Sequence, residues 1–374
     1  MRNDRLEHDR AHDDQVEKGR GGAGMRPTEP VGIAAAGLWL PEGRSLASDA
    51  VAAGRLRERA AEDLGHESLP DADVTAPPDA AVHAAHLALD AAGEPAERLA
   101  VLAHAWMYHQ GHDLWSPAHY VARRLGAPRA LPVGVQQVCN GGAAALGFVT
   151  AWLATANSAE ASRPRLGLVT TADRFAEPGF DRWASDYGVA YGDGGTAVVL
   201  RRPAAPGDAL LLRSVATYAD PELEEMHRGT DPFMPAARDL RERVDMRATK
   251  RAWLRVNGVE PFTTANERAI RTVMAEALAD AGMTASDPRL SHVVLPRFGA
   301  KTLTESWLPV LAQCVDAQLL DFGRATGHLG AGDALAGLAD LVRRGLPAPG
   351  HAALVFSAGA GFTWSCLLVE SPRR

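Results

Sequence analysis

One cysteine stands where a short β-like run meets a segment rich in glycine and alanine. The stretch reads VQQVCNGGAAAL over residues 135–146, with Cys139 at the junction. A thiol at a helix N-terminus lies at the positive end of the helix dipole, which favours the thiolate, the nucleophilic form. Gly141 and Gly142 allow backbone and substrate to approach closely. Cys139 is therefore a candidate nucleophile, and the alternative is a small buried hydrophobe, as free cysteines often are.

Four more stretches, three of them rich in glycine, carry the other candidate groups. They read VAYGDGGTAVVL (189–200), VVLPRFGAKTL (293–303), ATGHLGAGDALAGL (325–338) and SAGAGFTWSCLLV (357–369). The second places Arg297 directly after a buried strand, and the third carries His328 and Asp333 into a helix. An imidazole near a reactive thiol can serve as a general base at neutral pH. The alternative for His328 is a packed loop histidine.

Composition narrows the class of protein. The 374 residues carry a formal charge of −7, with 23% charged and 46% apolar residues, which is typical of one large or two ordinary globular domains without a nucleic-acid partner. No apolar run approaches the ~20 residues that span a bilayer. Three cysteines form no disulfide framework, so a reducing cytoplasm is expected. Walker, G-x-S-x-G and dinucleotide motifs are absent, and no cofactor is expected.

Helix and strand patterns alternate along most of the chain, which favours an α/β fold. Residues 1–26 are charged and poor in apolar side chains, so we expect a disordered tail. Two halves with the same order of elements follow, at 27–202 and 203–374, the second with an inserted loop or cap at 220–253. Strands are expected at 31–41, 98–106, 165–173, 195–202, 290–296 and 351–370, and helices at 79–93, 116–128, 262–283 and 332–345.

From about Val31 onwards, these stretches resemble the thiolase-fold condensing enzymes, specifically the ketoacyl-ACP synthase III-like proteins. QQVCNGGAAAL resembles the nucleophile segment, YGDGGTAVVL the glycine–aspartate–glycine strand turn, and AGAGFTW the closing loop. The resemblance implies a five-layered αβαβα fold, a homodimer and an acyl group carried on Cys139. It also implies an oxyanion site formed by the backbone N–H groups of Cys139 and Gly361.

The sequence departs from this family at the two residues that assist decarboxylation. The family histidine position, after Pro296, holds Arg297, and the family asparagine position, after Gly327, holds His328. Arginine is permanently charged and cannot act as a neutral acid–base. GHLGAGD instead resembles the acyltransferase subgroup of antibiotic biosynthesis. That resemblance implies transfer of an acyl group, an aryl or polyketide group among the candidates, from a carrier protein or other thioester to a hydroxyl or amine of a sugar, an aminocyclitol or a similar acceptor.

Other residues have two interpretations each. Asp333 either orients an active-site group, as the resemblance implies, or caps the helix that it opens. Arg297 either binds a carboxylate or phosphate of a substrate or forms a surface ion pair. By resemblance, an aromatic acyl site would be lined by Tyr108, His109, His112 and Trp115. A metal site at the two histidines of that segment is disfavoured because no ligand cluster accompanies them.

Two other functions remain open. One is a decarboxylative condensing enzyme in which His328 acts alone. The other is a non-catalytic partner subunit of a ketosynthase, a class that typically lacks the cysteine, so that Cys139 counts against it.

Overall fold

The computed structural model describes residues 23–25, 27, 29–155 and 164–373. Most of the predicted tail, 1–26, lies outside the described residues. The exception is β1 (Ala23–Met25), which pairs antiparallel with β9 (Leu210–Ala219). Backbone N–H and C=O groups can complete a ladder whatever the side chains are, so a segment poor in apolar residues still joins the sheet there. The tail prediction is wrong for these residues.

The N-terminal half builds one side of a mixed sheet. Its main elements are β2 (Val31–Trp39), α4 (Pro77–Ala92), β5 (Leu99–Ala105), α5 (Pro117–Leu125), β6 (Leu131–Val135), α6 (Gly141–Ala154), β7 (Arg165–Asp173) and β8 (Gly194–Arg202). A small excursion between β2 and α4 holds β3 (Arg44–Leu46), α2 (Ala47–Ala52), α3 (Glu58–Leu64) and β4 (Ser68–Pro70), and η1 (Ala96–Arg98) precedes β5.

The C-terminal half repeats this plan. After β9 its main elements are α9 (Glu260–Asp280), β10 (Leu290–Val294), α11 (Leu308–Cys314), β11 (Gln318–Leu320), α12 (Asp333–Arg344), β12 (Ala352–Gly359) and β13 (Thr363–Glu370). Shorter elements are η3 (Pro221–Leu223), α7 (Glu225–Arg228), α8 (Met246–Asn257), α10 (Ala300–Thr302), the π-turn η4 (Leu303–Trp307), η5 (Gly323–Ala325) and η6 (Gly330–Gly332).

Strand order confirms that the two halves are similar. One half runs β6-β5-β7-β8-β2 and the other β11-β10-β12-β13-β9, with matching parallel and antiparallel neighbours. The halves meet where β2 pairs antiparallel with β9.

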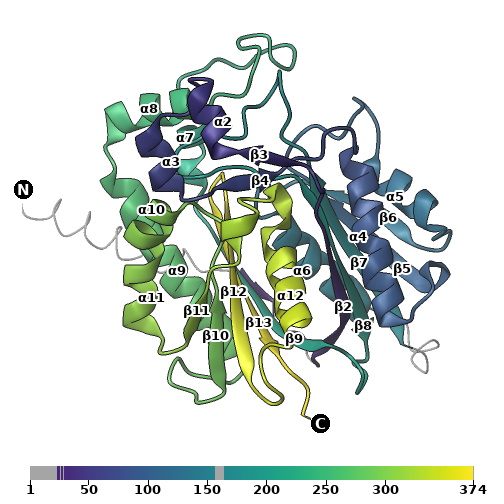
Figure 1. Ribbon diagram of the computed structural model, residues 1–374. Coiled ribbons are helices and arrows are strands. Elements are labelled where there is room, and N and C mark those ends of the chain that lie inside the picture. The colour runs from purple at the N-terminus through teal and green to yellow at the C-terminus, as the bar shows by residue number, and fades with distance from the viewer. Residues whose placement is uncertain (1–22, 26, 28, 156–163, 374) are drawn as a thin grey trace, which may run out of the picture.

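The helices form three layers around the two halves of the sheet. In Figure 1, α6 and α12 lie between the halves, with α4 and α5 outside one half and α9 and α11 outside the other. The central core joins α6 and α12 to strands of both halves, and separate cores lie under α4 and α9. This is the expected five-layered α/β arrangement, in which apolar strand faces are covered on both sides.

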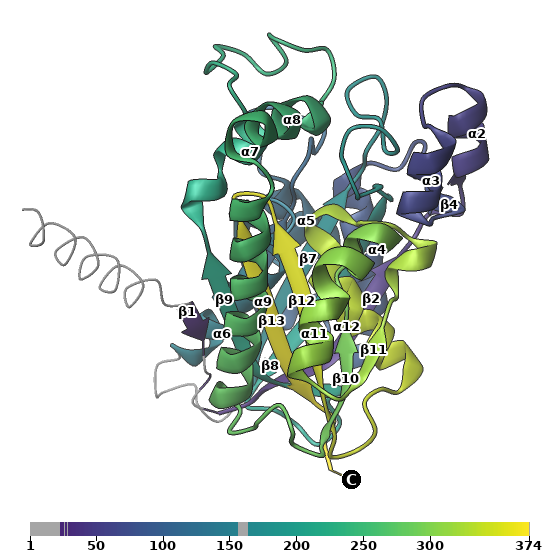
Figure 2. The same ribbon diagram turned by 90° about the vertical axis from the view of Figure 1, so that its left-hand side faces the viewer.

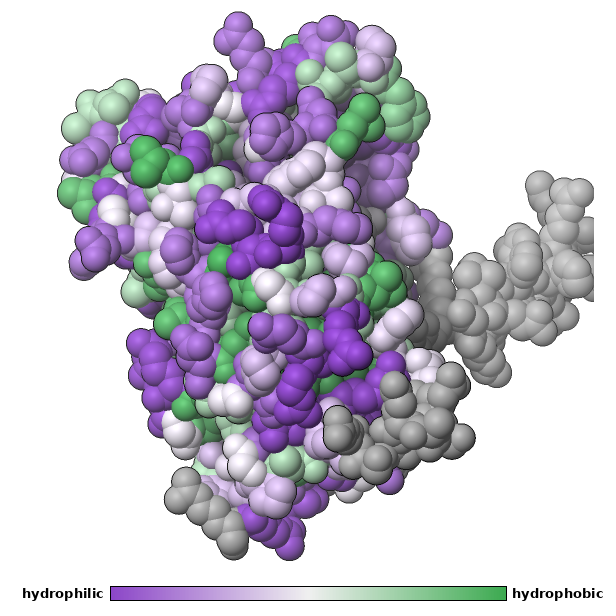
Figure 3. All heavy atoms as spheres, turned by 90° about the vertical axis from the view of Figure 1, so that its right-hand side faces the viewer, coloured by the Kyte–Doolittle hydropathy of each residue, from purple (hydrophilic) through white to green (hydrophobic). Residues whose placement is uncertain are grey.

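The segment predicted as an inserted loop or cap, 220–253, contains more helix than its polar sequence indicates. It comprises η3, α7 and most of α8, with irregular chain between α7 and α8. In Figure 2, α7 and α8 lie above α9. The face of the molecule that carries α4 and α5 has both hydrophilic and hydrophobic side chains on its surface (Figure 3). Within the described residues, no helix combines the length and apolar character needed to cross a bilayer.

Candidate active site

Cys139 lies in the turn between β6 and α6, one residue before the N-cap residue Asn140. Its side chain is 9% exposed, and its Sγ lies 3.7 Å from Met107 Sδ. The preceding residue, Val138, has φ of 46°, a left-handed conformation that a β-branched residue rarely adopts. Such strain persists only where surrounding structure enforces it, and it concentrates at functional sites.

The glycines after Cys139 are required by the contact between the two central helices. A Cβ on Gly142 would lie 2.5 Å from the Ala331 carbonyl oxygen, and one on Gly141 would lie 3.3 Å from the Ala331 Cβ. Glycine therefore lets the start of α6 pack directly against the turn that precedes α12. Since His328 lies in that turn, the same close packing brings the imidazole towards the thiol.

His328 is held between a carboxylate and the cavity. Its Nδ1 lies 2.6 Å from Asp333 Oδ2, while its Nε2 is buried with no oxygen or nitrogen partner among the described residues, which leaves this nitrogen to the Cys139 sulfur. Its backbone N–H donates to the Ala190 carbonyl (2.9 Å), which fixes the loop. Asp333 also accepts from the backbone N–H groups of Leu329 (2.8 Å) and Arg297 (3.2 Å). The Asp333 carboxylate thus orients the ring and makes no side-chain cap on α12.

Electrostatics favour a charged imidazole beside the sulfur. Burial alone would lower the pKa of His328, but Asp333 and Cys139 together raise this pKa well above its usual value. The cause is charge and hydrogen bonding from both partners, which favour the imidazolium. His328 therefore lies between the Asp333 carboxylate and the Cys139 sulfur, with its imidazole favoured in the charged form.

Asp173, at the end of β7, is a buried group that sequence analysis missed. Its carboxylate accepts from the backbone N–H groups of Tyr108 (2.8 Å), Ala331 (2.9 Å) and Met107 (3.0 Å). Burial raises the pKa of Asp173 to about 7, while these N–H donors oppose the rise. The contacts tie the turn before α12 to the chain that follows β5. The signal in the sequence that could have identified Asp173 is its position at the end of a strand predicted to be buried.

The β12–β13 turn lies against the nucleophile. A Cβ on Gly359 would lie 3.1 Å from Cys139 N and 2.6 Å from Asn140 N. Gly359, Ala360 and Phe362 line the cavity that contains Cys139, whereas Gly361, the predicted oxyanion donor, is not among the described residues that line it. Successive residues of a hairpin turn point in different directions, so a shift of one residue changes which N–H group faces the site.

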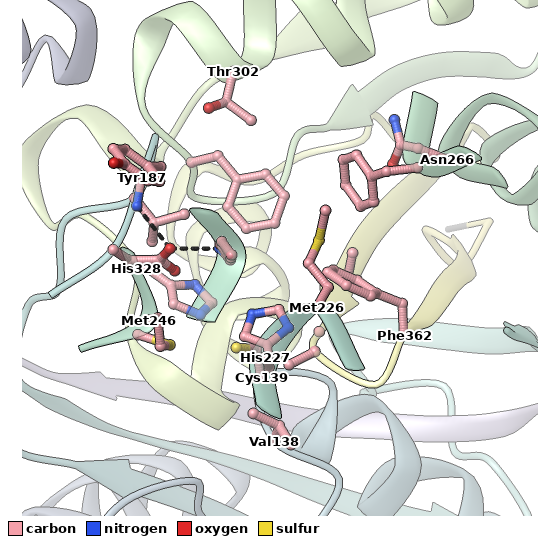
Figure 4. Close-up of a pocket in the computed structure, with 18 of the residues that line it drawn as sticks. Val138, Cys139, Tyr187, Met226, His227, Met246, Asn266, Thr302, His328 and Phe362 are labelled. Atoms are coloured by element: carbon pink, nitrogen blue, oxygen red, sulfur yellow. Dashed lines mark hydrogen bonds and ion pairs between the residues drawn. The ribbon is translucent and has the colours of Figure 1, made fainter. Parts of the chain in front are cut away.

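Cys139 and His328 open into one cavity of about 680 Å³. Most of its wall is apolar, built by Leu254, Phe262, Phe298, Trp307, Phe362 and Trp364. The volume suits an acyl group of considerable size together with a small second substrate. Figure 4 shows Cys139 and His328 with Met226, Met246 and Phe362 around the same space.

Three polar residues in this wall were also missed. Asp186, from the loop between β7 and β8, forms an ion pair with Lys250 of α8, and His227 comes from α7. Burial lowers the pKa of His227 to about 3, Lys250 adds to this effect and Asp186 opposes it. These residues lie in segments without a recognisable motif. The only signal for two of them in the sequence was the prediction of an inserted loop or cap at 220–253.

Arg297 does not bind in the cavity. Its side chain is 2% exposed, and its guanidinium donates to Asp340 Oδ2 (2.5 Å), to Thr326 Oγ1 (2.6 Å) and to the Phe322 carbonyl (3.0 Å). With these donors engaged inside the protein, both predicted roles, a substrate anchor and a surface ion pair, are wrong. Arg297 joins the chain after β10 to α12 instead.

The residues predicted to line an aromatic acyl site lie outside the Cys139 cavity. Four residues, Tyr108, His109, His112 and Trp115, line two neighbouring depressions and are not among the described residues around the Cys139 cavity. Tyr108 stacks on Phe175, and Trp115 packs against Tyr120. From the same segment only Met107 reaches the cavity. Within the described part of the chain, no cluster of three or more His, Cys, Asp or Glu side chains suits a metal ion.

Comparisons with known proteins show the family to which the chain belongs. Residues 278–371 match the family of 3-oxoacyl-[acyl-carrier-protein] synthase III C-terminal domains. The solved structure of ChlB3, described as an acyltransferase, is similar with a TM-score of 0.79 and 31% identity, covering 92% of this chain and 98% of ChlB3. No curated protein sequence matches the chain.

Two condensing enzymes share the fold at lower identity. The 3-oxoacyl-[acyl-carrier-protein] synthase III of Aquifex aeolicus VF5 has a TM-score of 0.70 and 21% identity, covering 91% of this chain and 99% of that one. AbyA1, a tetronic acid condensing enzyme, has a TM-score of 0.67 and 23% identity, covering 91% and 100%. The chain belongs to the thiolase-fold ketoacyl-ACP synthase III-like family, whose members here include acyl-transferring and condensing enzymes.

Proposed function

We propose that this protein is an acyltransferase that carries an acyl group on Cys139 and passes it to a hydroxyl or amine. The observation that carries the proposal is the arrangement of His328. Its Nδ1 is held by Asp333, and its Nε2 has no oxygen or nitrogen partner among the described residues, so this nitrogen is left to the thiol and to a substrate in the same cavity. Arg297, at the position of the family's decarboxylation histidine, is engaged with Asp340.

In the first step, the Cys139 thiolate attacks the thioester carbonyl carbon of a carrier protein or another acyl donor. The tetrahedral oxyanion accepts hydrogen bonds from the Cys139 N–H and from one N–H of the β12–β13 turn. We assign the second donor to Ala360, which lies between two other cavity-lining residues of this turn, Gly359 and Phe362. Each such donor contributes about 2.7–4 kcal/mol to transition-state stabilisation in comparable sites. The carbon–sulfur bond of the donor breaks, and the departing thiolate takes the proton of the His328 imidazolium.

In the second step, the neutral His328 takes the proton of the acceptor. The acceptor oxygen or nitrogen attacks the acyl-Cys139 carbonyl, the bond to the sulfur breaks, and the thiolate–imidazolium pair is restored. A single imidazole with a carboxylate partner meets the need of this reaction for a base. The proposed site lacks the second neutral hydrogen-bond donor that the family uses to stabilise a thioester during decarboxylation.

The biological setting follows from the family. We propose an acyl carrier protein as donor, an acceptor such as a sugar or an aminocyclitol, and a place in the biosynthesis of an antibiotic or another secondary metabolite in the cytoplasm. A homodimer is proposed as well. Strand β6 ends its half of the sheet with Leu131 43% exposed, an edge that a second copy could cover.

The experiment is acyl loading followed by intact-protein mass spectrometry. The wild-type protein and Cys314→Ala should gain the mass of the acyl group from a reactive thioester, and Cys139→Ala should not. Cys314 is a matched control because it is a free thiol outside the cavity. An acyl adduct that persists in Cys139→Ala would refute the assignment of the nucleophile.

Condensing neighbours keep a second candidate open, a decarboxylative synthase in which His328 acts alone. Malonyl thioester offered to the loaded enzyme separates the two: a condensing enzyme releases carbon dioxide, and the proposed acyltransferase does not. A non-catalytic partner subunit would load no acyl group at all.

A further inference from the structure

A polar cluster interrupts the apolar wall of the Cys139 cavity. It consists of Asp186, Lys250 and His227, and we call it the cap cluster because two of its members come from the cap helices α7 and α8. The side chains of Lys250 and Asp186 are 15% and 3% exposed, so the ion pair is largely withdrawn from solvent. Burying such a pair costs free energy that packed apolar residues would not cost, so its presence in a binding cavity calls for a function.

The cap cluster is connected to the catalytic side of the cavity. Asp186 Oδ2 accepts a hydrogen bond from the Tyr191 hydroxyl at 2.9 Å, and the Tyr191 ring makes an edge contact with the His328 ring at 5.2 Å. Figure 4 shows His227 and His328 with their rings near Cys139. A ligand that touches the cluster therefore occupies the same cavity as His328, which takes the proton of the acceptor in the proposed reaction.

His227 has a free hydrogen-bonding position. Its Nδ1 is buried and has no partner among the described residues, while its ring packs on Phe362 with centroids 5.0 Å apart. A neutral imidazole offers one donor and one acceptor. Lys250 offers N–H donors and Asp186 offers carboxylate oxygens, so the cluster presents both kinds of partner with no net charge.

We infer that the cap cluster binds the acceptor and selects a neutral molecule with a second hydroxyl beside the one that is acylated. A hydroxyl group donates and accepts at once, which matches a carboxylate, an ammonium and a neutral imidazole side by side. A strongly anionic acceptor would be repelled by the Asp186 carboxylate. An alcohol with a single hydroxyl, which is used for acylation, would form no hydrogen bonds with the cluster. This inference rests on the proposed acyltransferase function and names its acceptor class.

The test uses trans-1,2-cyclohexanediol and cyclohexanol as matched acceptors, which differ by one hydroxyl. Benzoyl and acetyl N-acetylcysteamine thioesters serve as donors. Acyl-Cys139 formation is followed by intact-protein mass spectrometry and ester formation by chromatography. The variants are His227→Gln and the double variant Asp186→Asn/Lys250→Met, which removes both charges together. Arg255→Ala, exposed on the same helix α8, is the matched control.

All variants should load the acyl group as the wild type does, which also shows that they fold. The wild type should favour the diol, and each cluster variant should raise the diol KM about tenfold or more, the effect of losing hydrogen bonds to charged or buried partners. The KM for cyclohexanol should rise less than the KM for the diol in each cluster variant, and Arg255→Ala should behave as wild type with both acceptors.

Three results would overturn the inference. Cluster variants that load and transfer to the diol with an unchanged KM would remove the cap cluster from acceptor binding while leaving the acyltransferase intact. A loaded wild type that transfers to neither alcohol, or equally well to both, would reject the acceptor class. A wild type that never loads Cys139 would reject the proposed function, and this inference with it.

Discussion

Replacing Asp333 with asparagine tests the electrostatic core of the site. In the protein, Asp333 Oδ2 lies 2.6 Å from His328 Nδ1 and Oδ1 accepts from Leu329 N at 2.8 Å. An asparagine oxygen can keep the bond to Leu329, and its NH₂ group then faces Nδ1. The ring must accept there, which places the proton on Nε2, so that the nitrogen facing the cavity can no longer act as a base.

The magnitude follows from the lost bond. A hydrogen bond to a charged group contributes about 1.5–3 kcal/mol, which corresponds to about a 10- to 100-fold change in rate. Acyl transfer to the acceptor, which needs the base, should slow by at least this factor. Without the carboxylate, burial lowers the pKa of His328, the imidazolium is lost, and alkylation of Cys139 by iodoacetamide should shift to higher pH.

The assay measures loading, transfer and alkylation separately in single-turnover experiments. Asp90→Asn, on the exposed face of α4, is the control for the amide substitution itself. Transfer rates and an alkylation profile in Asp333→Asn that match the wild type would refute the proposal that Asp333 positions and charges His328.

Three further predictions concern folding and pH. Gly142→Ala forces a Cβ to within 2.5 Å of the Ala331 oxygen and should lower the free energy of unfolding by about 1–3 kcal/mol. Gly207→Ala, whose Cβ would have no atom within 4 Å, should leave it unchanged. Equal thermal midpoints for the two variants would contradict the close contact at Gly142. Arg297→Met removes one of the two arginine partners of the buried Asp340, which keeps its ion pair with Arg343, and should cost about 1.5–3 kcal/mol in urea unfolding. A raised KM with unchanged stability would instead restore a substrate-binding role. The raised pKa of His328 contributes stability that is fully present below about pH 6.5 and is lost as the pH rises through the pKa of His328 in the folded protein. The free energy of unfolding of wild type should therefore exceed that of His328→Gln by less as the pH rises. A difference that grows with pH would contradict a raised pKa.

The fold was largely predictable because apolar periodicity and turn residues mark its elements. The expected helix at 332–345 is α12, and the strand expected at 165–173 is β7 with the same bounds. The elements between 44 and 70 and the helix α8 were missed. Their sequences are polar and short, and tertiary contacts rather than local pattern stabilise them.

The site was predictable only where glycine-rich turns mark strand and helix ends. Cys139, His328 and Asp333 lie in such turns, and the structure brings them together. The direction of a side chain is set by packing, which a motif does not encode. Arg297 therefore points to Asp340 instead of the cavity, and the segment with Tyr108 lies beside the cavity rather than in it.

Groups from the cap could not be derived from any motif. His227 and Lys250 come from helices in the segment predicted as an inserted cap, 220–253, and Asp186 comes from a long loop, so their meeting depends entirely on tertiary structure. The proposed choice of Ala360 in place of the predicted Gly361 as oxyanion donor likewise depends on the geometry of the β12–β13 turn, which no motif encodes.

The most direct test of the account begins with purified protein carrying an acyl group on Cys139 and free of excess donor. This acyl-enzyme is divided between an alcohol or amine acceptor and malonyl thioester, and the mass of the protein, the carbon dioxide released and the product are measured together. We predict that the acceptor removes the acyl mass and yields an ester or amide, and that malonyl thioester yields no carbon dioxide. Carbon dioxide release with a β-keto product, and no transfer to oxygen or nitrogen, would contradict the account.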